Sequence, residues 1–345
     1  MSARRATIAD VAREAGVAAS TASVVFSGKT PVSAPTRERV LAAAAALGYT
    51  GPDPRAASLR RGRSGIVGVV FRDRLGTAFL DPVTTVMMDG LADAVADVGA
   101  GLLLLRDDDG AEPSLNAAPV DAVVLIGCSV GMRDSLDVVR ARGLPVVVIE
   151  GDAGDGVPQV RLDNREGQAF IAGHLRDLGH REVVAVTLPA GPRRHAGWLR
   201  DPAAISVDVT RDRLAGMHDV FPAARAYATM GSLVDEGYAA GRAILATHPR
   251  PTAIMAQSDL LAIGVLRAVV DAGLRVPEDL SVTGFDGIAA DGIAPRVLTT
   301  MVQPAAEKGR AAGAAITAML AGAQAPTIRL TSTFRRGDTT GPPAG

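Results

Sequence analysis

The chain has 345 residues, of which 48% are apolar and only 3% aromatic, so we expect two or three compact units with cores of Ala, Val, Leu and Ile. Its single cysteine, Cys128, excludes internal disulfides and cysteine-rich metal sites and fits a reducing cytoplasm. A charged N-terminus and the absence of an apolar run of about 18 residues argue against a signal peptide and a membrane span.

The charge is distributed unevenly along the chain. Residues 1–64 carry ten basic and four acidic side chains, a formal charge of +6, whereas the remainder carries −7. A basic N-terminal segment on an acidic body indicates a polyanionic partner for that segment alone. A solvated charged tail is the alternative, and the helical pattern of the segment argues against it.

Three short helices are predicted in this segment. Thr7 and Asp10 form a capping box at the start of Ile8–Ala15, which ends at Gly16. A second helix covers Ala18–Phe26, and a third starts near Ser33 and stops at Gly48. Two short helices joined at a glycine and covered by a third are typical of a helix-turn-helix, whose second helix enters the DNA major groove. A generic three-helix bundle has the same periodicity, and the basic charge favours DNA.

The following segment, TGPDPRAASLRRGRS (residues 50–64), is predicted to be a linker. Pro52 and Pro54 interrupt any continuous helix. Residues 55–61 have room for only one or two helical turns, too few to be stable alone in water.

From Gly65 onward, apolar strand-like runs alternate with helical stretches. The strand candidates are Ile66–Phe71, Leu102–Leu105, Ala122–Ile126, Val146–Ile149, Val183–Thr187, Thr252–Ala256 and Leu280–Thr283. The helix candidates are Val83–Val98, Arg165–Leu178, Asp235–Ala246, Leu260–Ala272 and Ala305–Leu320. This alternation predicts an α/β body with parallel sheets covered on both faces, and ligands in such sheets bind beyond the carboxyl ends of the strands.

The pattern T-I-x-D-V-A-x-x-A-G-V-x-x-x-T-x-S from Thr7 to Ser23, followed by V-S-x-x-T-R-x-R-V from Val32 to Val40, closely resembles the N-terminus of the lactose-repressor (LacI/GalR) family. The resemblance continues along nearly the whole chain, through segments such as Arg213–Gly216 and Ser281–Asp286. It implies a helix-turn-helix head on a two-lobed body with the fold of periplasmic sugar-binding proteins.

The resemblance also implies the DNA contacts. Base edges are assigned to Ala19, Ser20 and Val24, phosphates to Thr7, Thr21, Ser23 and Lys29, and a further DNA contact to Ser27. Ala19 and Val24 have no hydrogen-bonding side chain, so they read only apolar features such as a thymine methyl group. In the linker, Leu59 is expected to wedge into the minor groove, with Arg55 beside it.

An effector site is expected between the lobes. By resemblance, Arg213 faces Asp286 across the pocket, where a guanidinium and a carboxylate suit paired sugar hydroxyls. Further candidates at strand ends or with a flat apolar surface are Phe79, Asp163, Trp198, Ser258, Asp259 and Phe285, with Glu150 a weaker one. Asp163 and Asp259 are equally expected to cap the helices that follow them, and Trp198 and Phe79 equally to pack as to stack on a ligand.

Other functional classes fit the sequence less well. Gly127–Gly131 reads G-x-S-x-G after a strand, the context of an α/β-hydrolase nucleophile elbow at Ser129, but no HGGG-like segment and no clear Asp–His pair accompanies it. NAD and zinc motifs are missing from the sequence, so no enzyme, cofactor or metal is expected. A sugar-binding protein without a DNA role shares the implied body but would not carry this head.

The predicted protein is therefore a cytoplasmic, sequence-specific transcriptional regulator, a repressor by resemblance, controlled by a small molecule of the sugar class. A homodimer is expected to read a near-palindromic operator. The expected domains are residues 1–50 (helix-turn-helix), 51–64 (hinge), 65–163 with 299–326 (first lobe) and 164–298 with 327–345 (second lobe).

Overall fold

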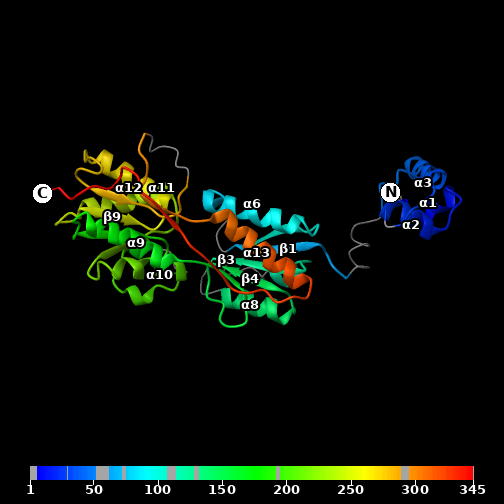
Figure 1. The fold of residues 1–345 in the computed structure, drawn as a ribbon, viewed down its shortest axis with the longest axis horizontal. Coiled ribbons are helices and arrows are strands. Elements are labelled where there is room, and N and C mark those ends of the chain that lie inside the picture. The colour runs from blue at the N-terminus through cyan, green and yellow to red at the C-terminus, as the bar shows by residue number, and fades with distance from the viewer. Residues whose placement is uncertain are drawn as a thin grey trace. The chain divides into compact units, whose positions relative to one another are not determined.

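The structure is a computed structural model that describes residues 6–28, 30–51, 62–71, 75–106, 114–127, 132–191, 195–288 and 295–344. It divides into two compact units, Met1–Gly65 and Ile66–Gly345 (Figure 1). Several residues singled out above lie outside the described residues, namely Lys29, Pro52, Pro54, Arg55, Leu59, Cys128 and Ser129.

The N-terminal unit contains the three predicted helices, α1 (Ile8–Glu14), α2 (Ala19–Ser27) and α3 (Ala34–Ala46). The capping box is confirmed: the Thr7 hydroxyl accepts from the Asp10 backbone N–H, and the Asp10 carboxylate accepts from the Thr7 backbone N–H at 3.0 Å. The core of the unit is made of small side chains from all three helices, namely Val11, Ala12, Ala15, Ala22, Val25, Val40, Ala43 and Ala44. Small core residues let these short helices approach closely, which leaves the other faces of α2 to solvent.

The first lobe of the larger unit is built on a parallel sheet with strand order β12-β5-β4-β3-β1-β2 among the described residues. Its strands are β1 (Ile66–Phe71), β2 (Gly101–Arg106), β3 (Ala122–Ile126), β4 (Val146–Ile149), β5 (Gln159–Leu162) and β12 (Ile328–Leu330). Its helices are α5 (Leu75–Ala78), α6 (Pro82–Ala96), α7 (Ser114–Ala117), α8 (Met132–Ala141) and α13 (Ala305–Leu320). Helices α6 and α13 cover one face and α8 the other (Figure 1).

The second lobe repeats this design with strand order β10-β9-β6-β8-β7, in which only the short β7 is antiparallel to its neighbour among the described strands. Its strands are β6 (Val183–Thr187), β7 (Gly197–Trp198), β8 (Arg225–Ala228), β9 (Ala253–Ala256) and β10 (Ser281–Thr283). Its helices are α9 (Asn164–Asp177), the 3-10 turn η1 (Pro202–Ala204), α10 (Asp208–His218), α11 (Val234–Leu245) and α12 (Asp259–Asp271). Helices α11 and α12 pack on one face and α9 and α10 on the other. The predicted α/β class with parallel sheets is confirmed.

A two-stranded antiparallel sheet of β11 (Thr300–Val302) and β13 (Thr333–Arg335) links the lobes. Strand β12 lies just beyond the expected boundary at residues 326/327, and it pairs with β5 of the first lobe. The chain thus crosses to the second lobe only after Leu330.

Glycines allow unusually close contact between paired helices. A Cβ atom on Gly264 of α12 would lie 2.0 Å from the carbonyl oxygen of Val234 and 2.4 Å from the amide nitrogen of Tyr238, both in α11. These are backbone atoms, so they cannot rotate away. The same holds for Gly309 of α13, whose Cβ would lie 1.9 Å from the Met87 carbonyl oxygen in α6.

We expect Gly264→Ala to lower the free energy of unfolding by about 1–3 kcal/mol or more, because the added methyl forces α11 and α12 apart. Urea unfolding followed by circular dichroism measures this. Gly173→Ala is the control, since the nearest atom to its Cβ is 4.0 Å away and an alanine in a helix interior stabilises by about 0.5–1 kcal/mol. Equal stability of the two variants would contradict the prediction.

Candidate functional site

One face of α2 in the N-terminal unit is polar and solvent-accessible. Ala19, Ser20 and Ser27 are exposed, and Ser23 and Val24 are half-buried on the same side of the helix. Thr21 is also half-buried, and Thr7 is exposed at the start of α1, where its hydroxyl donates to Asp10 at 2.7 Å. The residues predicted to contact DNA therefore leave the core to Ala22 and Val25 and present small hydroxyl and methyl groups outward.

A second polar cluster lies between the lobes, and its second-lobe half is centred on Arg213 of α10. The Arg213 side chain is 4% exposed, and its Nε donates to Oδ1 of Asn164 at 2.8 Å. Its Nη1 donates to the carbonyl oxygen of Gln257 and lies 3.5 Å from Oδ1 of Asp286. The guanidinium stacks on the fully buried Phe285 ring, 3.7 Å from the ring centre. The predicted pairing of Arg213 with Asp286 is thus present, and the Phe285 ring packs against one face of the guanidinium.

The first-lobe half consists of Glu150, at the end of β4, and Lys308 of α13. Their side chains are 12% and 4% exposed, and Glu150 Oε1 lies 2.5 Å from the Lys308 ammonium. Glu150 Oε2 accepts from Nδ2 of Asn164 at 2.7 Å. Lys308 donates to Oε1 of Gln303, whose Nε2 donates to Oδ1 of Asp286 at 2.6 Å.

These contacts close a circuit through six side chains, which we call the interlobe network: Arg213, Asn164, Glu150, Lys308, Gln303 and Asp286. Two of its members have strained backbones. Glu150 has φ 58° and Asp286 φ 133°, and they are the positive-φ residues other than glycine among the described residues. Such conformations cost about 1–3 kcal/mol each and concentrate at functional sites.

Burial raises the pKa of Asp286 well above the usual value, and the carboxylates of Asp81 and Asp259 raise it further, while Arg213 and Lys308 lower it. A carboxyl whose pKa is higher in the folded than in the unfolded state stabilises the fold while it is protonated. That contribution is lost as the pH rises above the unfolded value of about 3.9 and through the folded pKa.

Asp286→Asn removes this titration. We therefore expect the stability of the variant, relative to the unsubstituted protein, to increase from about pH 5 to about pH 7.5 in urea unfolding. Two stability–pH curves that run parallel over this range would show that Asp286 does not titrate in it.

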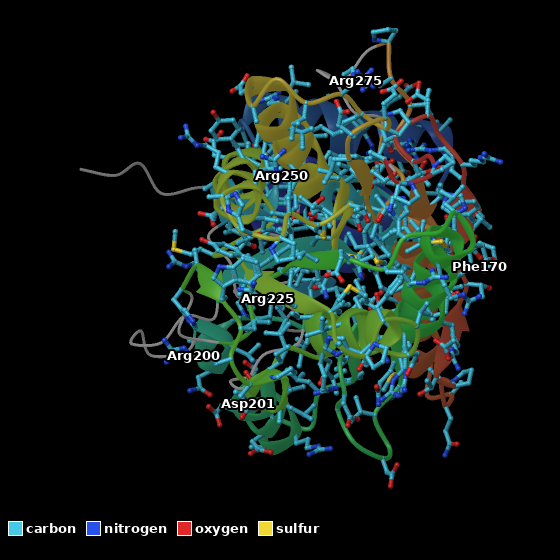
Figure 2. All side chains as sticks on the ribbon, turned by 90° about the vertical axis from the view of Figure 1, so that its left-hand side faces the viewer. Phe170, Arg200, Asp201, Arg225, Arg250 and Arg275 are labelled. Atoms are coloured by element: carbon cyan, nitrogen blue, oxygen red, sulfur yellow. The ribbon has the colours of Figure 1, made fainter. Side chains whose placement is uncertain are left out.

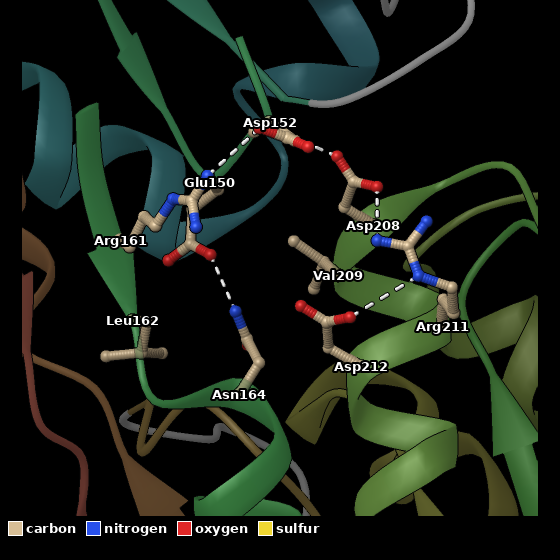
Figure 3. A pocket seen from close by; sticks show the side chains of 10 residues that line it. Glu150, Asp152, Arg161, Leu162, Asn164, Asp208, Val209, Arg211 and Asp212 are labelled. Atoms are coloured by element: carbon tan, nitrogen blue, oxygen red, sulfur yellow. Dashed lines mark hydrogen bonds and ion pairs between the residues drawn. The ribbon is translucent and has the colours of Figure 1, made fainter. Parts of the chain in front are cut away.

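A small polar cavity of about 130 Å³ adjoins the network at Glu150 and Asn164 (Figure 3). On the first-lobe side, Arg161 of β5 contacts Asp152 at 3.1 Å. The Asp152 backbone N–H donates to the carboxylate of Asp208 across the lobe boundary at 3.0 Å. Ligand pockets usually measure about 300–1,000 Å³, so a sugar-sized ligand requires this region to rearrange.

The opposite wall of the cavity is the N-terminal part of α10. Arg211 contacts Asp208 at 2.5 Å and Asp212 at 3.5 Å. Burial raises the pKa of Asp212, Arg211 opposes that shift, and the Asp208 carboxylate adds to it. This wall of the cavity therefore consists of charged side chains that pair with one another and remain partly exposed to solvent.

Comparison with known proteins matches both parts of the chain to known families. Residues 7–51 match the family described as bacterial regulatory proteins, lacI family, and residues 172–340 match the periplasmic binding protein-like domain. An HTH-type transcriptional regulator of Mycolicibacterium smegmatis is 35% identical over 99% of this chain and 98% of its own length. The chain belongs to the LacI family.

Two further proteins are similar over most of this regulator's length. The ribose operon repressor of Halalkalibacterium halodurans is 28% identical over 88% of this chain and 87% of its own. A solved complex of the transcriptional regulator CelR with cellobiose superimposes with a TM-score of 0.66 and 25% identity, covering 97% of this chain and 100% of that one.

This LacI-family protein is a transcriptional regulator with a DNA-binding helix-turn-helix head and an effector-binding, periplasmic-binding-protein-like body. Proteins of this family are regulators and not enzymes. No helix within the described ranges has the length and apolar character needed to span a membrane.

The other candidates at strand ends make hydrogen bonds that stabilise the fold of this regulator. Ser258 is the N-cap of α12, with its hydroxyl accepting from the Leu261 N–H, and it also accepts from Ser232. The Asp259 carboxylate accepts from the backbone N–H groups of Gly287 and Ile288 and from the Thr300 hydroxyl at 2.6 Å. It therefore holds the loop that carries Asp286 in place.

Asp163 occupies the N-cap position of α9, but its carboxylate accepts from the backbone N–H and the hydroxyl of Ser332, each at 2.8 Å. It joins the start of α9 to the segment between β12 and β13, where the chain returns to the second lobe. Asp163 therefore occupies the N-cap position of α9 without making a capping hydrogen bond. Helix α12 is capped by Ser258 and not by Asp259.

The two aromatic candidates pack against neighbouring side chains. Trp198 on β7 lies edge-to-face with Tyr227, and the Arg225 guanidinium stacks over it at 3.8 Å. Arg225 is labelled in Figure 2, with Arg200 and Asp201 below it in the same lobe. Phe79, 39% exposed, contacts the Phe71 ring with 5.7 Å between centres.

Lys308, Gln303 and Asn164 belong to the network although no sequence motif predicts them there. A signal for Lys308 is present in the sequence: it lies on the helix face that also carries Ala305, Ala312 and Ile316, all buried. A lysine on an apolar helix face is costly unless it has a partner, so its position points to a buried counter-charge.

Proposed function

We propose that this chain is a cytoplasmic repressor that binds a near-palindromic operator as a homodimer and whose operator affinity is set by a sugar bound between the lobes. Residues 1–50 read DNA and residues 51–64 form the hinge. The two lobes follow in the segments named above, except that β12 (Ile328–Leu330) belongs to the first lobe. The observation that carries this proposal is the interlobe network, because any ligand that exchanges hydrogen bonds with it changes how the two lobes contact each other.

The chemistry of the network favours a sugar. Hydroxyl groups both donate and accept, so they suit a site that contains carboxylates, a guanidinium, an ammonium and two amides. The cellobiose complex of one relative and the name of the ribose operon repressor support the same ligand class and a repressor role.

The operator contacts proposed within the described head are Thr7, Ala19, Ser20, Thr21, Ser23, Val24 and Ser27. Lys29, Arg55 and Leu59 complete the proposed set. Sequence preference is expected to reside in α2, because phosphate contacts fix position and base contacts specify sequence.

The experiment has two steps. An operator is first selected from a random double-stranded DNA pool with the full-length protein. Its affinity is then measured by fluorescence anisotropy with and without sugars that raise the thermal unfolding midpoint. Sugars that bind the protein and leave operator affinity unchanged would contradict effector control, and failure to enrich any sequence would contradict operator recognition.

Operator affinity is expected to fall steeply with salt, because bound phosphates release counterions. For a dimer making six or more phosphate contacts the loss between about 50 and 200 mM salt is about a thousandfold or more. Anisotropy titrations at four salt concentrations measure the slope. A flat dependence would be inconsistent with phosphate binding by the basic head.

A further inference from the structure

The first lobe contains an ion pair between two nearly buried side chains, Glu150 and Lys308. The other buried residues of α13 are small or apolar, whereas Lys308 is charged. A buried ion pair seldom stabilises a fold more than apolar residues of the same size do. Glu150 also holds a left-handed backbone conformation to reach this position. Stability alone does not account for the pair.

When Asp286 is ionised, the network is balanced in charge. Glu150 faces Lys308 at 2.5 Å in the first-lobe half, and Asp286 faces Arg213 at 3.5 Å in the second-lobe half. A neutral ligand that enters leaves this balance unchanged. A carboxylate leaves one excess negative charge, and a sugar phosphate at pH 8 leaves close to two, in a region from which water is largely removed, and such charges are costly.

The charged side chains around the adjoining cavity contribute less to the selection of ligand charge than the buried pairs do. Asp152, Arg161, Arg211 and Asp212 have side chains 46–61% exposed and are paired with one another or with Asp208. Water and salt screen exposed pairs of this kind. The buried pairs therefore dominate the selection of ligand charge.

We propose that Glu150 and Lys308 are the first-lobe part of the effector site and that they restrict the effector to uncharged polyhydroxy compounds, excluding sugar acids and sugar phosphates. A ligand hydroxyl enters between the two groups, accepts from the Lys308 ammonium and donates to the Glu150 carboxylate. This inference rests on the proposed function, in which the effector is a sugar bound between the lobes.

The test uses full-length protein at pH 8 and thermal unfolding with matched probes: glucose with glucuronate and glucose 6-phosphate, ribose with ribose 5-phosphate, and cellobiose. The proteins are the unsubstituted chain, Glu150→Gln and the double variant Glu150→Gln/Lys308→Met. Glu150→Gln keeps an oxygen for Asn164 and adds one net positive charge to the network, whereas the double variant restores neutrality. Glu307→Gln is the control, because Glu307 is 58% exposed on the same helix and pairs with Arg310.

We expect the unsubstituted protein and Glu307→Gln to bind a neutral probe and none of its charged counterparts. Glu150→Gln is expected to lose affinity for the neutral probe on the order of tenfold and to gain affinity for the monoanion glucuronate, whose single charge the variant compensates. The double variant is expected to prefer the neutral probe again. A purely structural role for the pair predicts no such reversal of preference.

Two results overturn the inference and leave the proposed function standing. One is an unsubstituted protein that binds an acid or a phosphate in preference to the neutral sugar. The other is a Glu150→Gln variant that keeps the original preference. If no probe of any charge binds the unsubstituted protein, the proposed sugar effector and the inference both fail.

Discussion

Replacement of Lys308 by methionine is expected to lower the free energy of unfolding by about 3–5 kcal/mol, as urea unfolding at neutral pH will measure. The substitution keeps the length of the side chain and removes its charge, so Glu150 stays buried with only the Asn164 amide as a partner. Removing one member of a buried ion pair costs this much because the other charge remains without compensation.

The double variant Glu150→Gln/Lys308→Met tests the cause of that loss. It leaves no charge in the first-lobe half, so most of the stability lost in Lys308→Met should return. Glu307→Gln, on the exposed side of the same helix, should stay within about 0.5 kcal/mol of the unsubstituted protein. A Lys308→Met protein as stable as the parent would mean that Glu150 needs no counter-charge.

Replacement of Ser20 by glutamate is expected to weaken operator binding by about a hundredfold or more, with thermal stability unchanged. Ser20 is exposed on α2, so the new carboxylate is accommodated in the folded head but faces DNA phosphates and base edges in the proposed complex. Loss of one good base contact is worth about 1–3 kcal/mol, and repulsion from phosphates adds to it.

Ala42→Glu is the matched control, because it adds the same charge to the same head at an exposed position on α3. Anisotropy with the selected operator should show only a small loss for this variant. Equal losses for Ser20→Glu and Ala42→Glu would indicate that net charge alone, and not the placement of α2, decides DNA binding.

Much of the fold follows from hydrophobic pattern. The predicted ranges of β1, β3, β4, β6 and α13 coincide with those in the structure, because the four strands are short runs of mostly apolar residues and α13 has apolar residues at helical spacing. Strands β7, β11, β12 and β13 have only two or three residues each, too short for a periodic signal. Their positions depend on pairing with distant segments, as when β12 joins β5 across more than a hundred residues of chain.

The candidate site was predictable in part. Arg213 and Asp286 were paired by family resemblance, and the structure places them 3.5 Å apart. The partners of Glu150 were not, because Asn164 and Lys308 come from helices whose relative position is set only by the packed lobes. Asp259 shows the reverse case: a carboxylate after a strand has several uses, and here it holds the backbone of Gly287 and Ile288.

The antiparallel pairing of β11 with β13 limits how the lobes can move. Two of the chain passages between the lobes are hydrogen-bonded to each other through Thr300–Arg335, Met301–Phe334 and Val302–Thr333, and Asp286 is bridged to Val302 of the same ladder. Two unpaired connections would bend independently, whereas two hydrogen-bonded strands move together. We therefore expect a ligand that shifts Asp286 to move β11 and β13 together, and the lobes to respond by rotating about this ladder.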